Sequence, residues 1–253
     1  MSIASLILGI LILGMNSAYA EQILTTYRDD GNATVWDGKW TFLQEWKRTS
    51  YDTAYGNQFV IRTGHDYKYL YVLIDFLSQV KFSKFSDLGI VCVDGSFDKE
   101  TQPQKDDYCF AVPLGSKNPI TLEGGSPLAI NNHFTKIEND PGLIAVGGIS
   151  DSNDRYTDVP HTSYEFRIPI EVFGKSDKYG FYVAAYVANE NRVYSWPEDI
   201  ANGGFSYIPS PSKWGDIISP DKSLPEFPLP LLALVISIFA VIYLSRQNQH
   251  CIK

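Results

Sequence analysis

The feature that most constrains the fold is a set of short segments in which apolar and polar residues alternate. Residues 162–168 (TSYEFRI) place Tyr164, Phe166 and Ile168 on one face and polar side chains on the other. Residues 68–76 (KYLYVLIDF) also alternate, and residues 179–188 are apolar on both faces. A period of two is that of a β-strand, because successive side chains point to opposite faces. These segments predict strands, and the third is typical of a central strand covered on both sides.

Further short apolar runs predict more strands, and turn residues separate them. The chain has 19 Gly and 14 Pro, together with 16 Tyr and 14 Phe. Helical periodicity is limited to one turn at 169–173. Many short strands with this punctuation predict an all-β fold, an antiparallel β-sandwich of two sheets spanning residues 21–219. The additional strands are expected at 59–62, 88–93, 108–112 and 143–146.

The N-terminal residues 1–20 are typical of a secretory signal peptide. Residues 3–13 form a short apolar core, and Ala18-Tyr19-Ala20 has the pattern of a cleavage site before Glu21. No Lys or Arg precedes the apolar core, which departs from the usual pattern. The alternative is an N-terminal helix that is not cleaved.

The C-terminal end predicts a membrane anchor. A Pro-rich stalk at 220–227 precedes an uncharged apolar run at 228–244, which is long enough to cross a thin hydrocarbon core as a helix. The basic residues Arg246 and Lys253 predict a cytoplasmic tail at 245–253. The Pro-Glu-Phe at 225–227 resembles PEF-type sorting tails of archaeal and bacterial surface proteins. We therefore expect the domain on the cell surface, held by a single transmembrane helix.

Charge limits the partners of the exported part. Residues 21–227 hold all 29 acidic residues and 19 of the 21 basic ones, a formal charge of −10. Nucleic acids and anionic lipid surfaces are bound by cationic faces, so neither is an expected partner.

Two cysteines, Cys92 and Cys109, lie on predicted neighbouring strands, whereas Cys251 follows the apolar run. In an oxidising compartment the first two are placed to form a disulfide, which would stabilise the fold by about 3 kcal/mol. A pair of buried free thiols is the alternative.

Several segments resemble family 9 carbohydrate-binding modules and their DOMON-like relatives. VWDGKWTFLQEWKR (35–48) has the Asp-Gly turn and Glu-Trp pair that open these modules, and GHDYKYLYVLIDF (64–76) resembles the next strand. Similar matches, in order, are the Asp-Asp-Tyr-x-Phe of the acidic hairpin, TSYEFRIPIEVFG (162–174), YGFYVAAYVANENRVYSWPE (179–198) and PSKWGDIIS (211–219). The resemblance implies an immunoglobulin-like β-sandwich, calcium in some members, and ligands that include sugars or haem.

For a sugar ligand, the aromatic rings are the first candidates, because they stack on the apolar faces of sugar rings. Trp196, in a polar loop, is the expected main anchor, flanked by Tyr194 and Tyr207, with Trp36 or Trp40 from another loop. Hydrogen-bonding partners are expected around Asn189 and Arg192. Trp46 and Trp214 are assigned to the core. For each tryptophan the alternative is structural packing.

The loop between the two cysteines is rich in carboxylates, which are calcium's preferred ligands. These carboxylates predict a solvated acidic turn, with a calcium site formed by Asp94, Asp98, Asp106 and Asp107 as the alternative. A second oxygen-rich stretch contains Asp151, Asn153, Asp154 and Asp158.

The sequence contains none of the common catalytic motifs, such as G-x-S-x-G or H-E-x-x-H, and an enzyme is not expected. The leading hypothesis is a non-catalytic carbohydrate-binding domain. Two alternatives remain. One is a haem-binding redox domain, for which the mature chain offers no Met ligand. The other is a structural protein that contacts other cell-envelope proteins.

Overall fold

The structure is a computed structural model that describes residues 21–28, 34–41, 44–201 and 208–220. The chain divides into two compact units, Met1–Ser219 and Pro220–Lys253. The predicted signal peptide, the transmembrane segment and the tail lie outside the described residues, as does all of the predicted stalk after Pro220. Among the described residues, no helix has the length and apolar character to span a membrane.

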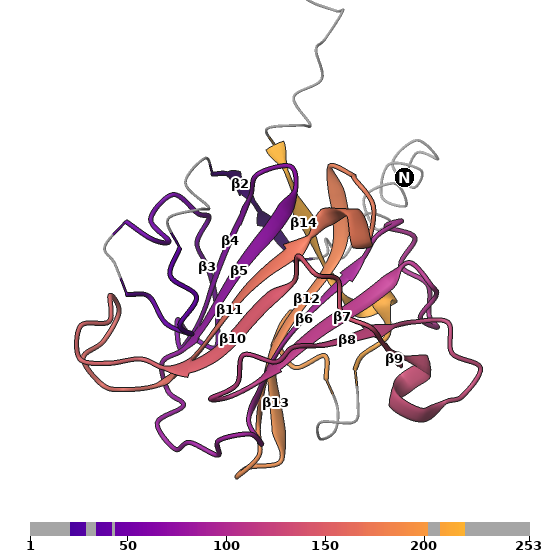
Figure 1. Cartoon of the computed structure of the whole chain (residues 1–253). Helices are drawn as coiled ribbons and strands as arrows, with labels where there is room; N and C mark the ends of the chain where they lie inside the picture. Colours follow the sequence, from indigo (N-terminus) through magenta and orange to yellow (C-terminus); the bar gives the residue numbers. More distant parts are fainter. Residues whose placement is uncertain (1–20, 29–33, 42–43, 202–207, 221–253) are drawn as a thin grey trace, which may run out of the picture. The chain divides into compact units, whose positions relative to one another are not determined.

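Two sheets form the β-sandwich that the sequence predicts (Figure 1). The first, called the β12 sheet, has the order β1-β14-β12-β6-β7-β8-β9, with β13 also paired to β12. Its strands are β1 (Gln22–Leu24), β6 (Leu88–Asp94), β7 (Asp107–Pro113), β8 (Ile120–Glu123), β9 (Thr135–Ile137), β12 (Lys178–Val187), β13 (Arg192–Trp196) and β14 (Gly215–Ile218).

The second, called the β5 sheet, has the order β10-β11-β5-β4-β2, with β3 also paired to β4. Its strands are β2 (Thr26–Tyr27), β3 (Asp52–Ala54), β4 (Phe59–His65), β5 (Tyr69–Phe76), β10 (Ile144–Ile149) and β11 (Thr162–Pro169). Most pairs are antiparallel, and β1–β14 and β2–β4 are parallel. Within the described ranges, the connections contain the short 3-10 helices η2 (Ile130–His133), η3 (Ile170–Val172) and η4 (Pro211–Lys213). The predicted helical turn at 169–173 is η3.

The main core lies between the sheets. Val72 and Ile74 of β5 belong to the same buried cluster as Val91 of β6 and Phe181 of β12. The strand β12 is buried on both faces, since Tyr182 and Ala184 belong to a second cluster on its outer side. The predicted central strand is thus confirmed.

The outer face of the β5 sheet is covered rather than solvated. Trp40 and Trp46 pack on Tyr71 and Leu73 of β5, with Tyr156 at the margin. For this reason the polar residues on the other face of β11, Ser163 and Glu165, are fully buried, although they do point away from the main core. Alternation assigns the two faces of the strand correctly, but it does not show what lies over each face. Arg167, the third of them, is half-buried.

Two further core assignments are confirmed. Trp46 is fully buried. Trp214 is buried on the outer side of the β12 sheet, where its ring stacks on Tyr182 with centroids 6.2 Å apart.

Candidate functional site

The acidic hairpin between β6 and β7 brings distant carboxylates together. Cys92 and Cys109 are directly opposite each other in the ladder and form the predicted disulfide. Two positions further along the same face, Asp94 lies opposite Asp107. Because side chains two residues apart share a face, the two carboxyl groups lie beside the disulfide on the outer side of the β12 sheet.

The neighbouring strand leaves room for this pair. Gly180 of β12 is the ladder partner of Asp94 on one side and of Asp216 on the other. A Cβ at Gly180 would lie 2.9 Å from the Cβ of Asp94, closer than real Cβ atoms approach, so the glycine admits the Asp94 side chain. Asp216 forms ion pairs with Lys99 and Lys178. These two lysines therefore neutralise Asp216, which lies on the other side of Gly180 from Asp94.

Backbone amides hold two of the carboxyl groups in place. Phe97 N–H donates to Oδ1 of Asp94 at 2.7 Å and Lys99 N–H to Oδ2 at 3.0 Å. Gln104 N–H donates to Oδ2 of Asp107 at 2.7 Å. The other oxygen of Asp107, Oδ1, is buried and has no hydrogen-bond partner among the described residues. Backbone amides of the loop are thus hydrogen-bonded to the aspartates at its two ends.

The electrostatics of this carboxylate cluster are unfavourable without a cation. Carboxylate oxygens of Asp94, Asp98 and Asp106 lie within 4.8 Å of one another. Burial raises the pKa of the Asp107 carboxyl to about 8, and the neighbouring carboxylates act in the same direction. Burial, more than repulsion, also raises the pKa of Asp94. A bound cation would relieve both effects, and the donor set consists of the hard oxygens that calcium prefers.

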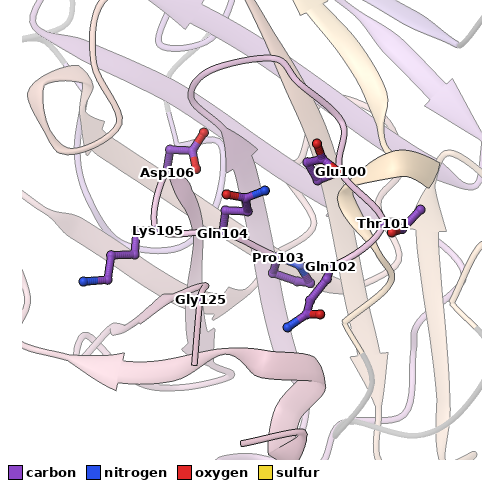
Figure 2. Close-up of a pocket in the computed structure, with 8 residues that line it drawn as sticks. All are labelled: Glu100, Thr101, Gln102, Pro103, Gln104, Lys105, Asp106 and Gly125. Atoms are coloured by element: carbon purple, nitrogen blue, oxygen red, sulfur yellow. The ribbon is translucent and has the colours of Figure 1, made fainter. Parts of the chain in front are cut away.

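A hollow of about 670 Å³ opens beside the cluster, and Figure 2 shows its lining. Apart from Gly125, every lining residue comes from the loop that joins Asp98 to Asp107. The walls carry amide, hydroxyl, carboxyl and ammonium groups from the residues Glu100, Thr101, Gln102, Pro103, Gln104, Lys105 and Asp106. We call this feature the loop hollow. Sequence inspection singled out the aspartates of this loop but missed Gln102, Gln104 and Lys105, although all occupy one polar connection between two strands.

The expected sugar anchor, Trp196, is in the core. Its side chain is 3% exposed, it belongs to the cluster between the sheets, and its ring lies 6.1 Å from that of Phe181. The polar sequence around it suggested a loop, but Trp196 ends β13 and pairs with Val183 of β12. The prediction that Trp196 offers an open stacking face is therefore wrong.

Three other predicted ligand residues lie together at the β12–β13 turn. The guanidinium of Arg192 lies 4.5 Å from the ring centroid of Tyr194, and the Tyr194 hydroxyl donates to Glu190. Ser83 donates to the Asn189 side chain. The Tyr194 ring also contacts Phe76 and Tyr55, with centroids 4.7 and 5.4 Å away, so its faces are already occupied.

The remaining tryptophans predicted for this site lie elsewhere. Trp36 stacks on Tyr71 of the β5 sheet, with centroids 6.2 Å apart, and Trp40 is buried in the same layer. The structure therefore does not assemble the aromatic site expected from the sequence. It does bring together three of the four carboxylates named for a calcium site, Asp94, Asp98 and Asp106, with Asp107 opposite Asp94 in the ladder. Tyr207, the other predicted flanking ring, lies outside the described residues.

Comparisons with known proteins give similarity in structure alone. No protein-family model matches the chain, and no curated protein does. Among solved structures, the chain is similar to a family 9 carbohydrate-binding module from Caldicellulosiruptor kristjanssonii in complex with cellotriose. The identity is 17%, the TM-score is 0.44, and the match covers 79% of this chain and 93% of that one. A structure of such a module from the same organism with glucose has 17% identity, a TM-score of 0.47, and coverage of 79% and 95%.

Proposed function

We propose that this chain is a non-catalytic carbohydrate-binding domain whose glycan site is the loop hollow. The observation that carries the proposal is the polar lining, concentrated in one loop next to a carboxylate cluster. Sugar hydroxyls both donate and accept hydrogen bonds. The amide groups of Gln102 and Gln104 can do the same, while Lys105 donates and Glu100 accepts.

The size of the hollow suits a small glycan. Sites for small molecules have volumes of roughly 300–1,000 Å³, and a volume of about 670 Å³ lies within that range. The hollow is open to solvent on one side, so a longer glycan could extend outward while one end is held. Binding here depends on hydrogen bonds rather than on the stacking face expected from Trp196.

Calcium at the carboxylate cluster is part of the proposal. Asp94, Asp98 and Asp106 would hold the ion, and Asp107 would lie behind them with its unpartnered oxygen. When bound, calcium would supply the positive charge that offsets these carboxylates, which would be its oxygen ligands. Because Asp106 belongs both to the cluster and to the wall of the hollow, ordering of the cluster would also fix one wall of the glycan site.

Cell-surface display is a further part of the proposal, and it rests on the sequence alone. The signal-like residues 1–20 and the apolar residues 228–244 support export and anchoring of the domain. A glycan-binding domain held outside the membrane would meet carbohydrate polymers directly.

A glycan array followed by calorimetry on the full-length chain, with calcium and then with EDTA, tests this function. We expect Gln104→Ala and Lys105→Ala each to weaken binding of the best array ligand by roughly two- to tenfold, since a hydrogen bond is worth roughly 0.5–1.5 kcal/mol. The matched controls Gln58→Ala and Lys68→Ala change exposed residues outside the hollow and should keep wild-type affinity.

Each negative outcome supports a different alternative. An empty array with a colourless protein would contradict the proposal and favour a structural role in the cell envelope. A strong Soret absorption band in the purified chain would instead indicate haem. Glycan binding that survives both substitutions in the hollow would place the site elsewhere on the domain.

A further inference from the structure

A second cluster of titratable groups is buried under the outer layer of the β5 sheet. Asp75 of β5, Asp154 of the β10–β11 connection and His161, just before β11, have side chains that are at most 1% exposed. The Nε2 atom of His161 lies 2.9 Å from Oδ1 of Asp75 and 4.0 Å from Oδ1 of Asp154. His161 and Asp75 are 86 residues apart in the sequence. Sequence inspection alone could not pair them.

The hydrogen bonds of the histidine ring fix its orientation. Nδ1 lies 2.9 Å from the carbonyl oxygen of Val159 and 2.8 Å from Oγ of Ser150. A carbonyl only accepts, so Nδ1 carries the hydrogen. Nε2, with its lone pair, then faces a carboxylate oxygen, and the two repel unless a cation lies between them. A metal-bound histidine commonly has the same arrangement, with its second nitrogen donating to a carbonyl.

Three buried oxygens of these neighbouring segments lack partners. Oδ2 of Asp75, Oδ2 of Asp154 and Oγ of Ser163 have none among the described residues. Ser163 is the direct ladder partner of Asp75, so the two side chains share a face of the sheet. An unpartnered buried polar atom costs roughly 1–3 kcal/mol, and more when it is charged. Two of these atoms belong to the carboxylates that face Nε2 of His161, which indicates an incomplete set of ligands.

The charge balance distinguishes a proton from a metal ion as the missing cation. A proton on Nε2 gives one positive charge against two carboxylates, which leaves one buried negative charge. In the described part of the chain, no Lys or Arg forms an ion pair with Asp75 or Asp154. Arg62 of β4, in the same layer, donates to the Tyr156 hydroxyl and the Thr49 carbonyl instead. A divalent ion bound to neutral histidine balances both carboxylates and gives their free oxygens a partner.

We propose that Asp75, Asp154 and His161 form a zinc site. One imidazole nitrogen with carboxylate oxygens suits zinc, whereas calcium and magnesium take oxygen ligands. Tetrahedral ligands at about 2.1 Å from the ion lie about 3.4 Å apart. In the structure, Nε2 of His161 lies 2.9 and 4.0 Å from the two carboxylate oxygens, on either side of that value. The hydroxyl of Ser163, the ladder partner of Asp75, is a further candidate oxygen ligand for the ion. The ion would join the connection 150–161 to strand β5.

This site is separate from the loop hollow, which lies on the β12 sheet, so it does not depend on the proposed function. The test is zinc content and affinity of the purified full-length chain after EDTA treatment and reloading with zinc. We expect one zinc per chain. His161→Ala and Asp154→Asn should weaken zinc binding at least by the roughly 10–100-fold that loss of an outer-shell partner costs.

The controls are His133→Ala, a half-buried histidine on the η2 turn, and Asp158→Asn, an exposed residue of the same connection. Both should retain zinc. Cobalt(II) in place of zinc should give visible absorption that changes in the Asp154→Asn protein, which reports ligation directly even if His161→Ala unfolds. A folded wild-type chain that binds no zinc, or one that binds it equally well after both substitutions, would overturn the proposal and leave a buried imidazolium ion pair.

Discussion

The indole Nε1 of Trp46 donates a hydrogen bond of 2.9 Å to Oε1 of Glu165, a residue 119 positions away. The other carboxyl oxygen, Oε2, accepts from the backbone amide of Gly38 at 2.8 Å. One fully buried carboxyl group thus attaches the covering segment that carries the tryptophans to the outer face of β11. Burial raises the pKa of Glu165 to about 8.

This hydrogen bond predicts the effect of removing its donor. Trp46→Phe keeps an aromatic ring but removes the N–H, so Oε1 of Glu165 loses its buried donor. We expect the free energy of unfolding to fall by at least the roughly 1–3 kcal/mol that an unsatisfied buried polar atom costs. Urea denaturation of the variant beside Trp36→Phe, whose ring is half-exposed, measures the difference. Equal losses in the two variants would mean that the hydrogen bond adds nothing beyond ring packing.

The Asp107 carboxyl predicts a pH dependence of stability. Its pKa is raised by burial to about 8 in the folded chain, against 3.8 for the ordinary group. Between these values the folded state keeps a proton that the unfolded state releases, so the free energy of unfolding falls as pH rises through this window. Glu165 acts with the same sign between 4.5 and about 8.

Asp107→Asn removes one of these two contributions. The amide oxygen can still accept from Gln104 N–H, and the side chain has no charge to bury. In EDTA we therefore expect the variant to be more stable than wild type at pH 8 and to lose less stability between pH 5 and 8. Thermal or urea unfolding across this range provides the measurement. An unchanged slope in Asp107→Asn would show that Asp107 ionises normally in the folded protein.

Calcium should act on the same cluster. An ion that binds only the folded state raises the free energy of unfolding, by about 2.7 kcal/mol when its concentration is a hundred times its dissociation constant. The unfolding temperature therefore rises with the calcium concentration. We expect this gain for wild type and a much smaller one for Asp98→Asn, which changes an exposed member of the cluster. Asp158→Asn, an exposed residue of a different loop, should respond as wild type does. Magnesium in place of calcium tests whether the effect is only screening.

The sequence was most informative where one strand or one hairpin sets the outcome. Alternation assigned the faces of β5 and β11. The hairpin between Cys92 and Cys109 predicted the disulfide and a concentration of carboxylates that includes Asp94, Asp98 and Asp106. Neither inference needs a contact between remote segments. The same holds for Trp214, assigned to the core from its place in the closing segment of the resemblance.

What could not be predicted depends on which segments lie over each strand. Ser163 and Glu165 are buried by a covering segment from far away in the chain, and Asp75 meets His161 only after β5 and β11 pair. Trp196 was misplaced for the same reason: its local sequence is polar, but its ladder partner on β12 directs the ring into the core. Local pattern reports the conformation of a segment, whereas these positions depend on tertiary neighbours.

The position of Trp196 predicts a coupled pair of substitutions. A Cβ at Gly215 would lie 2.4 Å from Cη2 and 2.7 Å from Cζ3 of Trp196, atoms of the outer part of the indole. Gly215→Ala should therefore destabilise the domain by roughly 1–3 kcal/mol through overpacking. Trp196→Phe removes that outer part, so the double variant should lose less stability than the two single losses combined. A double-mutant cycle by urea denaturation measures this coupling, and strict additivity would contradict the packing described here. Because Trp196 is outside the loop hollow, Trp196→Phe should leave glycan affinity unchanged, whereas Gln104→Ala should reduce it.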